Sequence, residues 1–205
     1  MAEKQEKKKK LRILAAGDIH GDSKLALELA KKAEREKVDL VILTGDIVGL
    51  IETQNLIKPF IDRKEKVFFV PGNWDSPETA EFLSKLYGIK NLEQYHARYG
   101  NIGIFGFGNP GTLSVNEKEA FETLRKNFNK VKDLEKKIMV THMHAAGTIS
   151  ELSGFPGSSG IRKAIEKFQP DIFISGHIHE LEGMEEKIGK TRVINVGRKG
   201  KIIEI

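Results

Sequence analysis

Short apolar runs alternate with amphipathic stretches along most of this 205-residue chain. Each apolar run has the length and the branched or large side chains typical of a buried β-strand, and the stretches between repeat their apolar residues at helical spacing. Leu25, Leu29 and Ala33, for example, recur on one face of a stretch whose expected N-cap is Ser23. Strands that alternate with helices predict an α/β fold with a mainly parallel sheet.

This alternation assigns most of the chain to strands or helices. The predicted parallel strands are Leu11–Ala16, Leu40–Leu43, Val67–Val70, Lys137–Thr141 and Asp171–Ser175. The predicted helices are Ser23–Lys37, a segment within Ile51–Ile61 that ends near Pro59, Pro77–Tyr87, Glu117–Val131 and Ile161–Phe168. Antiparallel strands are expected at Gln94–Tyr99 and Ile102–Phe107, joined by Gly100-Asn101, and at Gly183–Ile188, Arg192–Val196 and Lys201–Ile205.

Length and charge limit the organisation of the chain. A chain of 205 residues, 39% of them hydrophobic, is long enough for one well-buried core and short for two. We therefore expect a single domain over residues 11–205, preceded by a basic, disordered tail at residues 1–10. The tail holds five lysines and two glutamates, so the remainder carries only about +2 of the net charge of +5. Such a small charge gives little attraction for nucleic acid, and we expect no nucleic-acid partner.

Composition also bears on compartment and on ligand types. No apolar run approaches the roughly 20 residues that span a bilayer, so no membrane association is expected. The first ten residues lack the apolar stretch of a signal peptide, and we expect a cytoplasmic protein. The chain has no cysteine, which leaves Asp, Glu, Asn and His as metal ligands. Abundant lysine and glutamate favour a thermophilic source.

Five polar motifs directly follow predicted strands: G-D-I-H-G, T-G-D-I-V, P-G-N-W-D, T-H-M-H and S-G-H-I-H. The carboxyl ends of parallel strands are where such sheets bind ligands. The spacing of two in D-x-H and H-x-H points both side chains the same way in extended backbone. Each motif alone is usually a turn or a polar loop, but five of the six histidines of the chain lie in these motifs. The candidate ligands are Asp18, His20, Asp46, Asn73, His142, His177 and His179.

The chemistry of this set points to metal ions. Carboxylate, amide oxygen and imidazole together suit hard or borderline divalent cations. Two such ions held within about 4 Å of each other form a catalyst for phosphoryl transfer. The sequence therefore predicts a site for two divalent metal ions. Mn²⁺ is the expected ion, and Ni²⁺, Fe²⁺ and Zn²⁺ also suit the ligands.

The ordered motifs D-x-H, G-D, G-N-x-D, T-H and G-H-x-H resemble those of the calcineurin-like metallophosphoesterase superfamily, from the first strand to about Gly197. The resemblance implies a two-sheet β-sandwich flanked by helices. It also implies a small phosphodiesterase in which a hydroxide bridging the two metal ions attacks phosphorus. By the same resemblance, one metal would take Asp18, His20 and His179, the other would take Asn73, His142 and His177, and Asp46 would bridge them.

One residue departs from the family pattern. Many members have G-N-H-D or G-N-H-E, whereas this chain has Trp74 between Asn73 and Asp75. An indole does not titrate near neutral pH, so Trp74 cannot be the general acid implied by the family histidine. Asp75 loses its usual partner and is expected to be a turn or cap residue. Trp74 is expected either to stack on an aromatic leaving group or a nucleobase, or to pack in the core.

Further site residues are hypotheses with open alternatives. Asp46 and Asn73 are expected to act in catalysis as well as in metal binding. His144 is interpreted either as a substitute acid or phosphate contact, or as a residue that packs beside the site or exchanges roles with His142. Arg198 is either a substrate contact or an exposed turn residue. The loop Gly154–Gly160 either meets a phosphate through backbone N–H groups or is a simple connector.

Two classes of function follow. The first is a metal-dependent phosphodiesterase, with phosphomonoesterase as a secondary activity, acting on a small phosphodiester or nucleotide-like substrate. The second is a non-catalytic protein-binding scaffold with the same fold. Completeness of the ligand set favours the enzyme, because scaffolds of this superfamily tend to lose metal ligands. A DNA-repair nuclease is disfavoured by the short chain and its nearly neutral body. The sequence is also compatible with a homo-oligomer.

Overall fold

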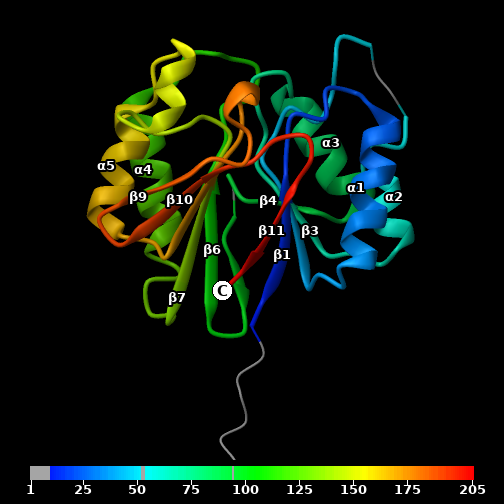
Figure 1. The fold of residues 1–205 in the computed structure, drawn as a ribbon, viewed down its shortest axis with the longest axis horizontal. Coiled ribbons are helices and arrows are strands. Elements are labelled where there is room, and N and C mark those ends of the chain that lie inside the picture. Colours follow the sequence, from blue (N-terminus) through cyan, green and yellow to red (C-terminus); the bar gives the residue numbers. More distant parts are fainter. Residues whose placement is uncertain (1–9, 52–53, 94) are drawn as a thin grey trace, which may run out of the picture.

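The computed structural model describes residues 10–51, 54–93 and 95–205, so the predicted tail lies almost wholly outside the described residues and stays a prediction. Among the described residues, two mixed β-sheets form the centre of the molecule and helices cover their outer faces (Figure 1). This architecture confirms the predicted α/β fold, a two-sheet sandwich flanked by helices.

The strands of each sheet are mainly parallel. The first sheet contains β11 (Lys201–Glu204), β1 (Arg12–Ala16), β2 (Leu40–Leu43), β3 (Val67–Phe69) and β4 (Lys90–Asn91), in that order. The second contains β5 (Ala97–Tyr99), β6 (Ile102–Phe107), β7 (Lys136–Thr141), β8 (Ile172–Ser175), β10 (Thr191–Asn195) and β9 (Glu185–Ile188), in that order. Only β11, β5 and β9 pair antiparallel, each at the edge of its sheet, within the described part of the chain.

The period of two along a strand divides the apolar residues between separate cores. In β1, Ile13 and Ala15 face the core between the two sheets, whereas Leu14 and Ala16 pack against the helices. Both faces of these strands are therefore buried, which explains why they read as continuous apolar runs. A third core lies between the second sheet and its helices.

Helices α1 (Ser23–Arg35), α2 (Lys58–Asp62) and α3 (Pro77–Tyr87) cover the first sheet, and α4 (Glu117–Phe128) and α5 (Ser159–Phe168) cover the second (Figure 1). Polar side chains cap most of them. Ser76 accepts a hydrogen bond from the N–H of Thr79 at the start of α3, where Pro77 occupies the first turn. The expected cap of α1 is wrong by one residue: Asp22 caps it, because its carboxylate accepts from the N–H groups of Lys24 and Leu25.

One predicted helix differs from the structure, and one short strand was not predicted. The helix expected within residues 51–61 begins only at Lys58, and Pro59 lies in its first turn instead of at its end. Proline is compatible with both places, since a first-turn residue needs no N–H partner. Residues 52–53 of that segment lie outside the described ones. The short strand β4 was not predicted, since two residues carry no readable period.

The carboxyl ends of β1, β2, β3, β7 and β8 lie at one end of the sandwich, and the five polar motifs follow them there (Figure 1). Among the described residues, no helix is long and apolar enough to cross a membrane. The cytoplasmic location and the thermophilic source expected from the sequence stay predictions.

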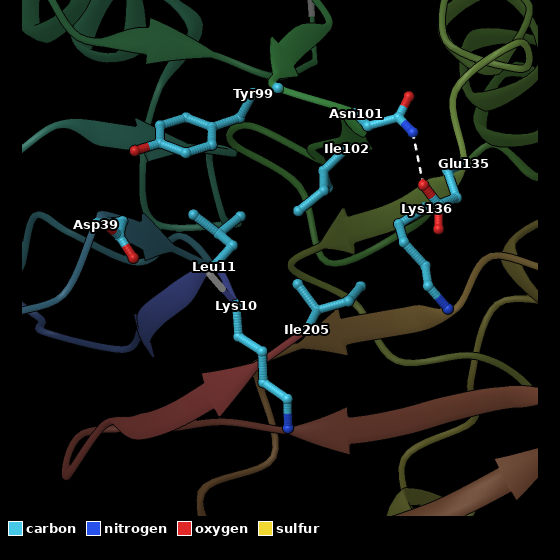
Figure 2. Close-up of a pocket in the computed structure, with 10 residues that line it drawn as sticks. Lys10, Leu11, Asp39, Tyr99, Asn101, Ile102, Glu135, Lys136 and Ile205 are labelled. Carbon is cyan, nitrogen blue, oxygen red and sulfur yellow. Dashed lines mark hydrogen bonds between the residues drawn. The ribbon is translucent and has the colours of Figure 1, made fainter. Parts of the chain in front are cut away.

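The opposite end of the sandwich holds a cavity of about 570 Å³ (Figure 2). Part of its lining is apolar and consists of Leu11, Tyr99, Ile102 and Ile205. Two polar side chains of its lining pair with each other: the Asn101 amide donates to Glu135 at 2.6 Å. None of the five motifs contributes to its lining, so the chemistry predicted from the sequence belongs to the other end.

Candidate metal centre

The loops after the strands hold four of the seven candidate ligands in left-handed backbone. Asp18, His20, Asp46 and His177 have φ values of 57°, 48°, 51° and 72°. Non-glycine residues avoid this region because Cβ crowds the backbone, at a cost of about 1 kcal/mol or more per residue. Strain of this kind persists where the surrounding structure imposes it, and it clusters at functional sites. Here it turns the side chains of successive loops towards one another.

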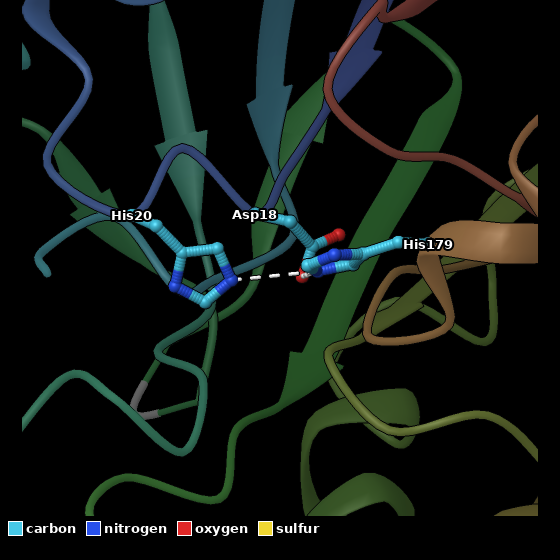
Figure 3. Close-up of side chains that lie close together, drawn as sticks. All are labelled: Asp18, His20 and His179. Carbon is cyan, nitrogen blue, oxygen red and sulfur yellow. Dashed lines mark hydrogen bonds and ion pairs between the residues drawn. The ribbon is translucent and has the colours of Figure 1, made fainter.

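Asp18, His20 and His179 form the first group (Figure 3). Each offers one ligand atom, and these atoms all lie within 4.8 Å of one another. His179 Nε2 lies 3.4 Å from Asp18 Oδ1 and 3.4 Å from His20 Nε2. Asp18 is fully buried. The three side chains of Figure 3 point at one another from loops that follow β1 and β8, so this group contains ligands from both sheets.

Asp46, His142 and His177 form the second group, and Asn73 lies beside it. His142 Nε2 lies 3.4 Å from Asp46 Oδ2, 3.2 Å from His177 Nδ1 and 2.9 Å from Asn73 Oδ1. Asp46 and Asn73 follow strands of the first sheet, whereas His142 and His177 follow strands of the second. This group too draws its ligands from both sheets.

The donor atoms of this second group fit a cation when the His142 ring is neutral. His142 Nδ1 donates to the carbonyl oxygen of Thr44 at 2.7 Å, and a carbonyl only accepts. The proton of neutral His142 is therefore on Nδ1, and Nε2 presents a lone pair to Asn73 Oδ1 and Asp46 Oδ2. Three acceptor atoms that converge without a proton among them repel one another, and a divalent cation removes that repulsion. The donor set fits a metal ion.

Asp46 connects the two groups. Its Oδ2 lies 3.4 Å from His142 Nε2 and 3.7 Å from His20 Nε2, so the same oxygen faces both sets of ligands. Its other oxygen accepts a hydrogen bond from the backbone N–H of Trp74 at 2.9 Å. Burial raises the pKa of the Asp46 carboxyl above its ordinary value. A cation beside the carboxylate would offset that cost of burying its charge.

Two glycines allow the Asp46 and Asn73 loops to approach each other. A Cβ on Gly72 would collide with the carboxylate of Asp46. Gly45 has a φ of +95°, and a Cβ there would lie 2.5 Å from the nitrogen of Gly72. The close approach of backbone in G-D and G-N thus needs glycine at both positions.

The Asp75 carboxylate links the loop that carries Asp46 to the loop that carries Asn73. Its side chain is fully buried and accepts hydrogen bonds from the N–H groups of Ile47 and Val48 through Oδ1, at 2.9 and 3.0 Å. Its Oδ2 accepts from the N–H of Gly72 at 2.9 Å. Asp75 is therefore a turn residue, as expected, and it fixes the backbone directly after Asp46 relative to the backbone before Asn73.

The pKa values of three histidines of the centre are shifted in different directions. Burial, with the neighbouring His142 and His144, lowers the pKa of His177 to about 4. Burial also lowers the pKa of His20 below its ordinary value. A hydrogen bond to the Asp18 carboxylate instead raises the pKa of His179. Neutral imidazole is the form that ligates a metal ion, so His20 and His177 are ready to bind at neutral pH.

Trp74 lies at the rim of the centre, not in the core. Its side chain is 44% exposed, and its ring stands edge-on to the ring of His20, with the centroids 5.4 Å apart. The core-packing alternative is therefore wrong. Stacking on a substrate stays a prediction.

His144 packs beside the centre. It is 1% exposed, its Nε2 donates to the carbonyl oxygen of Phe155 at 3.2 Å, and its ring lies parallel to that of His177 at 6.2 Å between centroids. His142, not His144, faces the other ligands, so the two do not exchange roles. The contacts match the packing alternative, and an acid role for His144 stays a prediction.

Two further expectations concern phosphate contacts. Arg198 donates to the carbonyl oxygen of Asp18 at 3.2 Å and to the carboxylate of Asp22 at 2.9 Å, which ties it to the first motif. A substrate contact by Arg198 stays a prediction. In the loop Gly154–Gly160, the N–H of Gly157 and that of Gly160 donate to glutamates of this chain, Glu151 and Glu117 respectively. Phosphate binding through these N–H groups is wrong because internal carboxylates already occupy them.

The groups that position His142 and Arg198 were not identified from the sequence. The Thr44 carbonyl that sets the His142 tautomer is a backbone atom, and no residue type signals it. Asp22 carried a signal, because an acid directly before a predicted helix is a typical N-cap and an available partner for Arg198.

The family model for calcineurin-like phosphoesterases matches residues 11–181, which include all seven candidate ligands. The chain belongs to the calcineurin-like phosphoesterase family. This membership confirms the resemblance drawn from the motifs and supports a metal-dependent phosphoesterase, a hydrolase whose candidate ligand groups are those described above. No curated protein sequence matches the chain.

Solved structures share the fold of this family member at low sequence identity. The protein TT1561 of Thermus thermophilus is 16% identical, with a TM-score of 0.73, over 96% of this chain and 99% of that one. A dimetal phosphatase from Danio rerio is 14% identical, with a TM-score of 0.59, over 92% and 88% of the two chains. An archaeal phosphodiesterase is 19% identical, with a TM-score of 0.55, over 95% and 98%. At these identities the likeness concerns the fold alone.

Proposed function

We propose that this phosphoesterase is a phosphodiesterase that uses two divalent metal ions. The position of Asp46 Oδ2, between His20 Nε2 at 3.7 Å and His142 Nε2 at 3.4 Å, is the observation that carries the proposal. A shared carboxylate lets two cations lie close together despite their repulsion. The fold itself accommodates such chemistry, since it is shared by an archaeal phosphodiesterase and by a dimetal phosphatase.

The residues divide the work of holding the ions. Asp18, His20 and His179 would hold one, Asn73, His142 and His177 the other, and Asp46 would bridge them. The two ions supply activation of a water nucleophile and neutralisation of phosphoryl oxygens. The loop that carries Asn73 also orients the Asp46 side chain, because the backbone N–H of Trp74 donates a hydrogen bond to the Asp46 carboxylate. We propose Mn²⁺ as the ion, with Ni²⁺, Fe²⁺ and Zn²⁺ as substitutes.

A diester is favoured over a monoester by charge. A phosphomonoester carries more negative charge than a diester and gains more from additional cationic side chains. Arg198 is engaged by the Asp18 carbonyl and the Asp22 carboxylate. Trp74 replaces the titratable residue that assists poor leaving groups. The proposed substrate is therefore a small or nucleotide-like phosphodiester with a good leaving group, and nucleic acid is not proposed as a partner.

Leaving-group dependence tests the acid role proposed from sequence for His144. Replacement of an acid costs about 10²- to 10⁴-fold for poor leaving groups and little for good ones. His144→Asn should therefore slow alkyl diesters far more than p-nitrophenyl diesters if His144 donates the proton. An equal loss on both substrates would mean that His144 only packs against His177.

The proposed function is tested by comparing rates on bis(p-nitrophenyl) phosphate and p-nitrophenyl phosphate with the Mn²⁺-loaded protein. We expect faster turnover of the diester, and a loss of at least about 100-fold in Asp46→Asn with the circular dichroism spectrum unchanged. Faster turnover of the monoester would refute the diester preference. Two bound ions without turnover of either substrate would instead favour the protein-binding scaffold.

A further inference from the structure

An open cavity of about 480 Å³ lies directly beside the metal centre. Its lining consists of His20, Gly49, Leu50, Ile51 and Trp74. Leu50 is 88% exposed, Ile51 82% and Trp74 44%, which is unusual for large apolar side chains on one small area. The volume lies within the range of small-molecule sites. Because His20 belongs both to this lining and to the first ligand group, the cavity adjoins the centre.

The backbone fixes this cavity against the centre. The N–H of His20 donates to the carbonyl of Asp46 at 2.8 Å, and the N–H of Gly21 donates to the carbonyl of Ile47 at 3.0 Å. Gly49 packs so closely on His20 that a Cβ there would lie 2.5 Å from the His20 carbonyl oxygen. The chain that carries Leu50 is therefore anchored to the ligand loops, and a phosphate at the centre would lie next to its apolar side chains.

The chemistry of the lining selects an apolar occupant. Leu50 and Ile51 offer only aliphatic carbon, and Trp74 offers an aromatic face and a single N–H donor. His20 is the one residue of the lining with a titratable side chain, and it is turned towards Asp18 and His179 (Figure 3). A second phosphate or a sugar placed here would lose its hydrogen bonds to water without replacement. An alkyl chain or an aryl ring would instead bury apolar surface.

We propose that this cavity binds an apolar ester group of the substrate, an alkyl chain or an aryl ring, while the phosphate occupies the metal centre. The inference rests on the proposed function and names the substrate class: amphiphilic phosphoesters whose apolar group lies between Leu50, Ile51 and Trp74. Of the two substrate types proposed above, the cavity favours the small phosphodiester over the nucleotide-like one, because the lining leaves the polar edge of a base without matched partners.

Alkylphosphonates of increasing length isolate the apolar contact, because each carries one phosphoryl group and one alkyl group. The Mn²⁺-loaded protein is titrated calorimetrically with methyl-, butyl- and octylphosphonate. Partial burial in an open cavity should tighten binding by about twofold per methylene until the cavity is filled. We therefore expect octylphosphonate to bind at least about tenfold more tightly than methylphosphonate.

Single substitutions test whether the apolar residues of the cavity cause this increase in affinity with chain length. Leu50→Ser should bring the octyl-to-methyl ratio close to 1 and leave the affinity for methylphosphonate unchanged. Trp74→Ala should also lower the ratio. Leu86→Ser is the matched control: this leucine is 56% exposed in the last turn of α3 and does not line the cavity, so it should keep the full ratio. A ratio near 1 in the unmodified protein, or a ratio that Leu50→Ser and Trp74→Ala leave intact, would overturn the inference.

Two further outcomes are distinguishable. Turnover of bis(p-nitrophenyl) phosphate with chain-length-independent phosphonate binding overturns this inference and leaves the proposed function standing. Absence of both turnover and methylphosphonate binding overturns the two together. Sedimentation of the unmodified protein and Leu50→Ser gives a last control. Equal masses support a substrate cavity, whereas loss of a dimer in the variant would assign the apolar area to a second copy of the chain.

Discussion

Asp75 Oδ1 accepts the backbone N–H of Ile47 at 2.9 Å, so a carboxylate outside the candidate ligand set fixes the residue directly after Asp46. With its hydrogen bonds from Val48 and Gly72, Asp75 joins the loops of two different strands. Although this chain departs from the family pattern at Trp74, Asp75 therefore keeps a structural role. Its position depends on backbone donors, and these are independent of the residue at position 74.

Replacement of Asp75 should weaken both folding and metal binding. Asp75→Ala leaves three N–H groups without an acceptor, and the two buried ones cost about 1–3 kcal/mol each before relaxation. We expect a loss of at least about 3 kcal/mol in the free energy of unfolding and a 10- to 100-fold weaker Mn²⁺ affinity, measured by urea unfolding and calorimetry. Asp75→Asn retains Oδ1 and turns an amide N–H₂ against Gly72, so it should be the milder variant. Unchanged Mn²⁺ affinity in a folded Asp75→Ala would contradict the positioning role.

Restoring histidine at position 74 tests the missing acid. Trp74→His places a titratable ring in the family position, but Asp75 already accepts three hydrogen bonds from backbone donors and is less free to orient it. We expect a gain of roughly tenfold on a poor leaving group, below the 10²- to 10⁴-fold of a well-placed acid, and little change on p-nitrophenyl diesters. The kcat/KM values for both substrates measure this, with Trp74→Phe as control. An equal change on both substrates would show that the new ring does not donate a proton.

Metal binding should raise the melting temperature. The left-handed backbone of Asp18, Asp46 and His177 and the facing acceptor atoms of the second ligand group are costs that a bound cation offsets. At a free Mn²⁺ concentration about 100 times Kd, stabilisation is about 2.7 kcal/mol, equivalent to roughly 5–10 °C for a chain of this size. Scanning calorimetry with Mn²⁺ and with EDTA measures the shift. Asp46→Asn should show a smaller one, and an equal shift in both proteins would place the ions elsewhere.

Glu185 should make stability depend on acid pH. Hydrogen bonds from Arg192, and then from Lys201, lower the pKa of Glu185 to about 2, from 4.5 in the unfolded chain. A lowered folded-state pKa gives stability that is present above pH 4.5 and is lost as the pH falls towards 2. Glu185→Gln should therefore melt below the unmodified protein at pH 7, with the difference shrinking between pH 4.5 and 2. Glu28→Gln, an exposed change on α1, is the control, and a difference independent of pH would contradict the ion pair.

The strand ends and the candidate ligands could be predicted because their signals are local. A buried strand such as β1 shows its length and its apolar composition directly, and the polar residues after it stand out. The helix start at Lys58 could not be predicted, since Pro59 suits both a helix end and a first turn. The partners of Arg198 and of the Gly157 N–H lie far away or on a neighbouring turn, and only the packed chain brings them together.

Each ligand group takes side chains from both sheets, so two bound ions would cross-link the two sheets at the interface between them. Asp18 and His20 face His179 across it, and Asp46 faces His142. If the chain were cut in the turn between β5 and β6, at Gly100-Asn101, the two fragments would carry complementary halves of each ion's coordination shell. Association of those fragments would then depend on the ion concentration. The interface between the sheets could therefore be used to build a split protein that assembles only when metal is bound.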